Sequence, residues 1–173
     1  MEHLKYPIGK YQENTAFTQH QIRDAIEELM IFPETLKKTV CNLSDNELAK
    51  TYREGSWTIK QLVHHIGESH TNAYIRIKLA LTEENPTIKP YDENLWVNTK
   101  ENEILPISVS LQLIEAIHLR LATLLQTLTE KELARTFFHP QSKQTWRISD
   151  IISMYSWHGK HHLAHIRLAL DKK

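Results

Sequence analysis

Four histidines within eight residues near the end of the sequence could bind a transition metal. They are His158, His161, His162 and His165. On a helix, His158 and His162 lie one turn apart and point the same way, with His165 next on that stripe. A pair of imidazoles at this spacing can hold one metal ion. The stripe is otherwise apolar, so imidazoles without partners there would cost about 1–3 kcal/mol each. The spacing therefore favours a metal site, and a hydrogen-bonded structural network is the alternative.

A catalytic metal site needs a third protein ligand and an open position. The candidates lie in a second cluster, which contains His64, His65, Glu68 and His70. A helical wheel directs His64 away from the apolar face, toward solvent or a partner chain. It places His70 closest to the apolar face and His65 on the flank of that face. The spacing alone therefore gives His70 a slight preference as the third ligand.

Both clusters fall on long predicted helices. Apolar residues recur every three to four positions, the period of an amphipathic helix. Pro33 should kink the first helix or split it in two, because proline cannot donate a helical hydrogen bond. The predicted helices span residues 18–42, 58–81, 108–128 and 149–170.

Shorter elements connect the long helices. Capping boxes at residues 44–47 and 129–132 predict two short helices. Residues 137–147 should form a loop or a small hairpin, and residues 1–16 should be irregular. Residues 83–106 contain three prolines, which predicts a second irregular segment. A loop of that length is uncommon without a role, so this segment could cover a site.

The two halves of the sequence resemble each other weakly. Residues 44–52 parallel residues 129–137, and Trp57 parallels Trp146. Each half reads as a long helix, a short capped helix, a loop with a tryptophan and a second long helix. Two such halves packed together predict one all-α domain over residues 1–173, a four-helix bundle with pseudo-twofold character.

Composition excludes several classes of protein. The chain has 21 Lys and Arg against 21 Asp and Glu, which argues against a basic nucleic-acid surface. We expect no membrane span, because no stretch approaches about 20 apolar residues. The single Cys41 excludes an internal disulfide and a cysteine-rich zinc site, and its place at a helix end predicts packing. Without a leader-like apolar run near Met1, we expect a cytoplasmic protein.

Several sequence strings resemble those of one family. Residues 57–65 read WTIKQLVHH, and Trp157-His158 is followed by His162 after three residues. Further shared strings are residues 6–9 (YPIG) and residues 161–166, and the resemblance covers nearly the whole chain. They resemble the DinB superfamily, and within it the YfiT-like group of metal-dependent hydrolases from Gram-positive bacteria. Lys160 departs from the histidine found in those relatives, but it is not at a ligand position.

The resemblance implies a four-helix bundle with one divalent metal per subunit. Carried over by position, the ligands are His65, His158 and His162, so that His65 replaces His70 as the expected third ligand. The resemblance implies zinc as the first choice and nickel as the alternative, and it also implies a homodimer. Neutral imidazoles suit several transition metals, so the sequence itself does not choose between them.

The expected function is that of a metal-dependent hydrolase acting on a small molecule through activated water. The alternative is a bacillithiol S-transferase, in which the metal would activate a low-molecular-weight thiol for detoxification. The second alternative is a non-catalytic metal-binding protein, in which the histidines only join two helices. No His-Glu-x2-His pattern is present, which argues against peptide hydrolysis. Residues that could orient the ligands or move protons are Glu68, Tyr155, His161 and His165.

Overall fold

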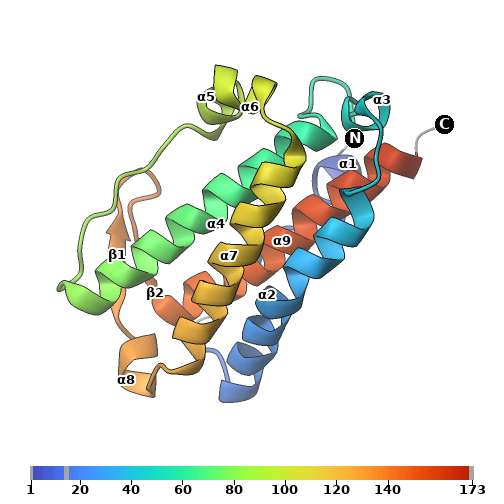
Figure 1. Ribbon diagram of the computed structural model, residues 1–173. Coiled ribbons are helices and arrows are strands. Elements are labelled where there is room, and N and C mark those ends of the chain that lie inside the picture. Colours follow the sequence, from blue (N-terminus) through green and yellow to red (C-terminus); the bar gives the residue numbers. More distant parts are fainter. Residues whose placement is uncertain (1, 14–15, 172–173) are drawn as a thin grey trace.

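Four long helices form the body of the protein. The computed structural model describes residues 2–13 and 16–171. The long helices are α2 (Gln19–Val40), α4 (Ile59–Thr82), α7 (Ile107–Gln126) and α9 (Ile148–Asp171). They pack as a ring in which α2 contacts α7 and α9, and α4 contacts the same two helices (Figure 1). The four-helix bundle predicted from the sequence is confirmed.

The short elements lie at the two ends and along one side of this bundle (Figure 1). The two capping boxes begin α3 and α8, as predicted. The strands β1 and β2 pair antiparallel, so the predicted loop or hairpin is a hairpin. The segments predicted to be irregular contain three short helices, and that prediction was wrong there. The short elements are α1 (Glu2–Lys5), α3 (Asp45–Leu48), α5 (Glu93–Val97), α6 (Lys100–Ile104), α8 (Glu130–Leu133), β1 (Thr136–His139) and β2 (Gln144–Arg147).

Pro33 does not split the first long helix, because α2 continues through it. Proline has no N–H, so the carbonyl of Leu29, four residues earlier, loses its helical partner. The Nδ1 of His118 on α7 lies 2.6 Å from that carbonyl oxygen and donates to it. An imidazole from the neighbouring helix thus replaces the hydrogen bond that proline removes. This substitution explains why α2 tolerates a proline inside the bundle.

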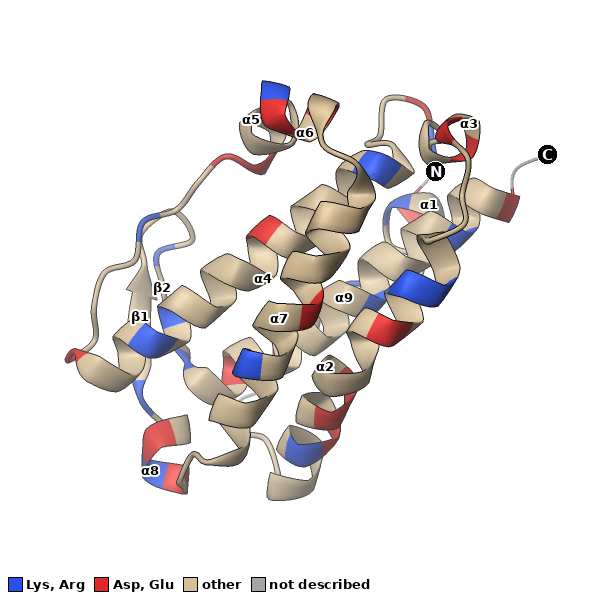
Figure 2. Ribbon diagram, in the orientation of Figure 1, with Lys and Arg blue, Asp and Glu red and all other residues tan. Residues whose placement is uncertain are grey.

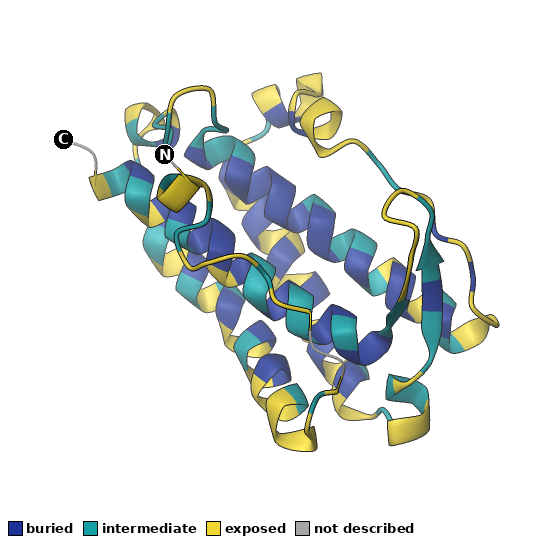
Figure 3. Ribbon diagram, turned by 180° about the vertical axis from the view of Figure 1, so that it is seen from behind, coloured by how far each residue is buried: buried dark blue, intermediate teal, exposed yellow. Residues whose placement is uncertain are grey.

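The apolar core is divided into two clusters along the bundle axis. One cluster includes Leu29, Ile77 and Ile152, and the other includes Leu36 and Leu62. On α4, α7 and α9, histidines lie between the two clusters. We call this group the histidine layer. Buried residues line the inner faces of the long helices (Figure 3). The histidine layer consists of His65, His70, His118, His158 and His162.

The structure bears on two expectations from the sequence, a missing membrane span and the packing of Cys41. By length and composition alone, α7 could cross a membrane. However, Leu121 and Leu111 of α7 belong one to each core cluster. The apolar character of α7 is therefore that of a core helix in a bundle. Cys41 was predicted to pack, but it is exposed at the end of α2. Charged residues of both signs are interspersed along the long helices (Figure 2).

Candidate metal centre

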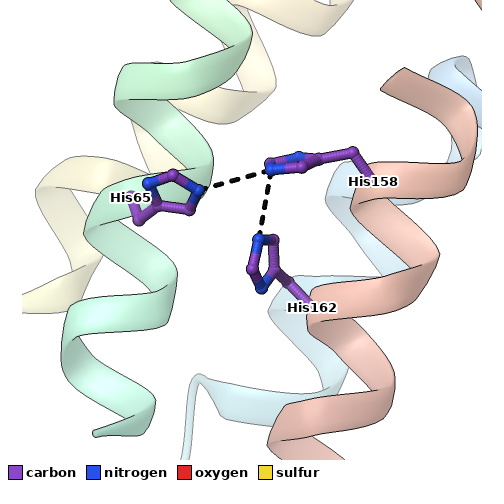
Figure 4. Close-up of side chains that lie close together, drawn as sticks. All are labelled: His65, His158 and His162. Carbon is purple, nitrogen blue, oxygen red and sulfur yellow. Dashed lines mark hydrogen bonds between the residues drawn. The ribbon is translucent and has the colours of Figure 1, made fainter. Parts of the chain in front are cut away.

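Three histidine side chains converge from two helices of the bundle. His65 points from α4 toward His158 and His162 on α9 (Figure 4). The Nε2 of His158 lies 3.3 Å from the Nε2 of His65 and 3.1 Å from the Nε2 of His162. Candidate ligand atoms of all three residues lie within 4.8 Å of one another. The structure thus brings together the three residues that the resemblance selected.

Hydrogen bonding among the three rings does not explain this arrangement. An imidazole nitrogen has one in-plane position for a proton or a lone pair. The Nε2 of His158 can therefore pair with only one of the two nitrogens that face it. Two nitrogens bound 2.0–2.1 Å from one tetrahedral ion would lie about 3.3 Å apart. The two separations from His158 Nε2 are close to that value, and all three donors lie within 4.8 Å of one another, so they fit a single transition-metal ion.

His158 is oriented from inside the bundle by His70. The Nε2 of His70 lies 3.1 Å from the Nδ1 of His158. When the lone pair of His158 Nε2 is directed to a metal, Nδ1 carries the proton and donates to His70. His70 also stacks on His118 at a centroid distance of 4.8 Å. His70 therefore supports one of the three histidines and is not itself one of them.

His162 is oriented by a relay that ends at the N-terminal segment. The Nε2 of His165 lies 3.2 Å from the carbonyl oxygen of Lys5 and must donate to it. Neutral His165 then accepts at Nδ1, which lies 3.4 Å from the Nδ1 of His162. His162 donates in this contact and keeps a lone pair on Nε2 for a metal. His165 therefore orients His162 through this hydrogen bond, as residues hydrogen-bonded to metal ligands commonly do.

Burial keeps the converging imidazoles neutral. Desolvation lowers the pKa of His65 to about 4. The pKa values of His158 and His162 lie well below the ordinary value. Desolvation is the larger cause, and the charges of neighbouring histidines are the smaller one. Neutral imidazole is the form that binds a metal, so the site is ready for an ion at pH 7 without competition from protons.

A second group of three histidines shares a member with the first. His161, His162 and His165 also place candidate ligand atoms within 4.8 Å of one another. The Nδ1 of His162 is the atom that faces His165, and its Nε2 faces the first group. Because His165 is already bonded to Lys5, this second group is better explained as the relay that orients His162.

Other residues of the α4 cluster are placed differently from the predictions. His64 was predicted to face solvent or a partner chain, but it is 1% exposed, and its Nδ1 lies 2.7 Å from the hydroxyl of Ser110 on α7. Glu68 accepts a hydrogen bond of 2.8 Å from Asn102 on α6, and no carboxylate joins the described histidine groups. Glu68 therefore fastens the α5–α6 segment over α4. The prediction for His64 was wrong because α7 covers the side of α4 that the wheel assigned to solvent.

Two cavities flank the converging histidines. A cavity of about 230 Å³ reaches His158 from the side of the hairpin, and one of about 250 Å³ reaches His162 from the side of the N-terminal segment. Trp57 separates the second cavity from His65, with a ring distance of 4.6 Å. His161 lines this second cavity, and Tyr155 lines the first. Small molecules can thus approach His158 from one cavity and His162 from the other.

Sequence reasoning missed two residues near the site. His118 was not considered, although Pro33 in the facing helix signals a carbonyl in need of a donor. Arg76, which lines the cavity beside His158, was also missed. A single arginine within an otherwise apolar helical stripe was the available signal for it.

Comparison with known proteins finds similar sequences and structures. The family model of the DinB superfamily matches residues 29–166. A protein from Oceanobacillus iheyensis, named as a proposed metal-dependent hydrolase, is 48% identical over 98% of this chain and 97% of its own. A protein of the same name from Halalkalibacterium halodurans is 46% identical over 96% of each chain.

Two solved structures share the fold. YfiT from Bacillus subtilis superposes with a TM-score of 0.93. It is described as a metal-dependent hydrolase by inference, with an unusual four-helix bundle topology. It is 41% identical, over 95% of this chain and 94% of its own. The mycothiol-dependent maleylpyruvate isomerase has a TM-score of 0.66 at 18% identity, over 87% of this chain and 63% of its own, which shows a likeness of fold alone.

Proposed function

Because this chain belongs to the DinB superfamily, we propose that it is a metal-dependent hydrolase of a small molecule, with His65, His158 and His162 as the ligands of one divalent ion. The observation that carries the proposal is the convergence of three neutral Nε2 atoms between two cavities. Three protein ligands leave positions for water and substrate, as in catalytic zinc sites. The names of the relatives support the same class of enzyme.

A bound ion would supply Lewis-acid activation of water near neutral pH. The chain would supply the positions of the reactants around it. Trp57 and Tyr155 would wall the two approaches and limit the access of bulk water. His161 is neutral, because burial lowers its pKa to about 4. It can therefore accept a hydrogen bond from a group in the cavity beside His162, but it is too weak a base to retain a proton at pH 7.

A second candidate is transfer of a low-molecular-weight thiol, such as bacillithiol, to an electrophile. Two cavities on different sides of the three histidines would suit two reactants. No carboxylate joins the described histidine groups, so the usual general base of a hydrolase lacks a counterpart there. A purely structural metal site, the remaining alternative, would not need an approach from either side. The two cavities favour the enzymatic proposals over it.

Further properties of the proposed enzyme rest on the donor set and the family. Imidazole ligands suit zinc and nickel, and we propose zinc as the resident ion. We also propose a cytoplasmic homodimer that acts without nucleic acid or membrane.

Metal analysis of the purified protein tests the site. The wild type should bind about one equivalent of zinc, and His158→Ala should lose it, because two remaining imidazoles do not complete the site. The matched control is His20→Ala, since His20 is an exposed histidine on α2. Retention of one tightly bound equivalent by His158→Ala would contradict the ligand assignment.

Activity assays then separate the two reactions. The zinc-loaded wild type is incubated with a panel of esters and amides, and separately with a thiol and an electrophile. Release of acid from the panel supports hydrolysis, and formation of a thioether supports transfer. In either case the activity should disappear in His158→Ala and persist in His20→Ala. Bound zinc without either activity would favour the structural alternative.

A further inference from the structure

Arg76 is a buried cation for which the described residues provide no carboxylate partner. It is 8% exposed, and its Nε has no acceptor. Its Nη1 donates to the hydroxyl of Tyr155 at 3.4 Å. No carboxylate oxygen of the described part of the chain lies within 4 Å of its guanidinium. A guanidinium remains charged, and buried charges are normally paired. The guanidinium of Arg76 therefore has no directly paired carboxylate among the described residues.

Arg76 lies on the same stripe of α4 as His65. The two residues are eleven positions apart, which is three helical turns and places them about 20° apart around the axis. Side chains on a helix lean toward its N-terminus, so the guanidinium reaches back toward the histidine layer. Arg76 and His158 line the same cavity, of about 230 Å³. A ligand in this cavity would contact both.

Hydroxyl groups form part of the polar lining around the guanidinium, beside His139, Gln141 and Glu93. The cavity is lined by Ser69, Tyr91 and Tyr155 as well as Arg76. Burial raises the pKa of Tyr91, so that its hydroxyl stays protonated and can donate. Glu93 also lines the cavity, but it is exposed to solvent and does not pair with Arg76. Hydroxyl donors around an unpaired guanidinium form a site suited to an oxyanion.

We propose that this cavity is a carboxylate-binding subsite, in which Arg76 binds a carboxylate of the substrate and directs its reacting group toward His158. A carboxylate matches the planar fork of a guanidinium with two parallel hydrogen bonds. It would also neutralise a charge that lies near a divalent ion. The proposed enzyme would therefore act on small carboxylic acids. The direction of the reacting group rests on the proposed function, but carboxylate binding by Arg76 does not.

Two thiols that differ only in charge test the subsite. The probes are 3-mercaptopropionate and its neutral amide, 3-mercaptopropionamide, bound to cobalt-loaded protein. A thiolate bound to cobalt gives a charge-transfer absorption band that reports occupancy. The wild type should bind the carboxylate at least tenfold more tightly than the amide. In Arg76→Met this preference should fall to about one, while the affinity for the amide changes less than twofold.

Two further variants separate a binding role from a structural one. Arg76→Lys keeps the charge but loses the fork, so it should keep part of the preference. Arg167→Met removes an exposed arginine of α9 and should leave the preference unchanged. The Tm of Arg76→Met should equal or exceed that of the wild type, since an unpaired buried charge is removed. An unchanged preference in Arg76→Met, or a lower Tm with loss of both probes, would overturn the proposal.

Metal-free protein distinguishes failure of the subsite from failure of the proposed function. Binding of succinate is followed by the NMR shifts of the indole N–H of Trp146, which lines the same cavity. Arg76-dependent shifts in a protein that binds no metal would support the subsite and reject the proposed function. The protein could instead bind metal but show no carboxylate preference and no succinate shifts that depend on Arg76. That result would reject the subsite and leave the proposed function standing.

Discussion

The two α9 histidines of the candidate centre are held by two different supports. His158 contacts His70, which stacks on His118, and His118 donates to the carbonyl of Leu29 in α2. His162 contacts His165, which donates to the carbonyl of Lys5 in the N-terminal segment. Both supports end on a backbone carbonyl. One lies inside the bundle, and the other depends on a segment docked against its surface.

The difference between the two supports predicts different kinds of sensitivity. The inner support is fixed by packing of α2, α4, α7 and α9, so it should hold whenever the bundle is folded. The outer support needs the short helix α1 to stay against α9. The geometry of His158 should therefore be set by the folded core, whereas that of His162 should follow the docking of the N-terminal segment.

The largest expected effect is a loss of stability of the metal-free protein in acid, because of the inner support. Burial lowers the pKa of His118 to about 4, from about 6.5 in the unfolded chain. Between these values the unfolded chain binds more protons, so stability falls as the pH decreases from 6.5 to 4. The pKa difference corresponds to about 3 kcal/mol from His118.

Urea unfolding at a series of pH values measures this effect. His118→Phe keeps an aromatic ring in the stack with Phe32 and His70. It should show a shallower decrease in the free energy of unfolding between pH 6.5 and 4 than the wild type does. Parallel curves for the two proteins would mean that His118 is not held neutral by burial.

An intermediate effect on metal affinity should separate the two supports. His70→Leu leaves a buried N–H of His158 without an acceptor, so zinc affinity should fall toward 100-fold. His165→Leu should cost nearer tenfold, because the Nδ1 of His162 can find water through the adjoining cavity. Competition with a metal-binding dye gives both values, with His20→Leu as the exposed control. Equal losses would show that the outer support matters as much as the inner one.

The long helices and the helix starts could be predicted from local sequence. The apolar period and the side-chain caps act within a few residues, and all four predicted long helices agree with the structure to within two residues at each end. The capping boxes at Ser44 and Thr129 are both formed. By contrast, α5 and α6 are short helices in a proline-rich segment. Contacts such as that of Asn102 with Glu68 help to hold them, and no local pattern encodes such a contact.

The site was less predictable from local patterns. A helical wheel assumes one apolar face, but α4 is covered by α7 on one side and by α9 on another. His64 therefore found a partner in Ser110, and His70 became a support of His158. The choice of His65 came from the family resemblance, because its approach to His158 depends on how two helices cross.

The smallest effect concerns the carbonyl on which the inner support ends. His118→Phe should destabilise the protein at pH 7, because the carbonyl of Leu29 loses its donor. Pro33→Ala supplies a helical N–H to that carbonyl, so it should recover about 1 kcal/mol in the His118→Phe background. In the wild-type background the gain should be smaller, since His118 already occupies the carbonyl. A double-mutant cycle by urea unfolding measures this coupling. Strict additivity of the two substitutions would show that His118 does not replace the bond that Pro33 removes.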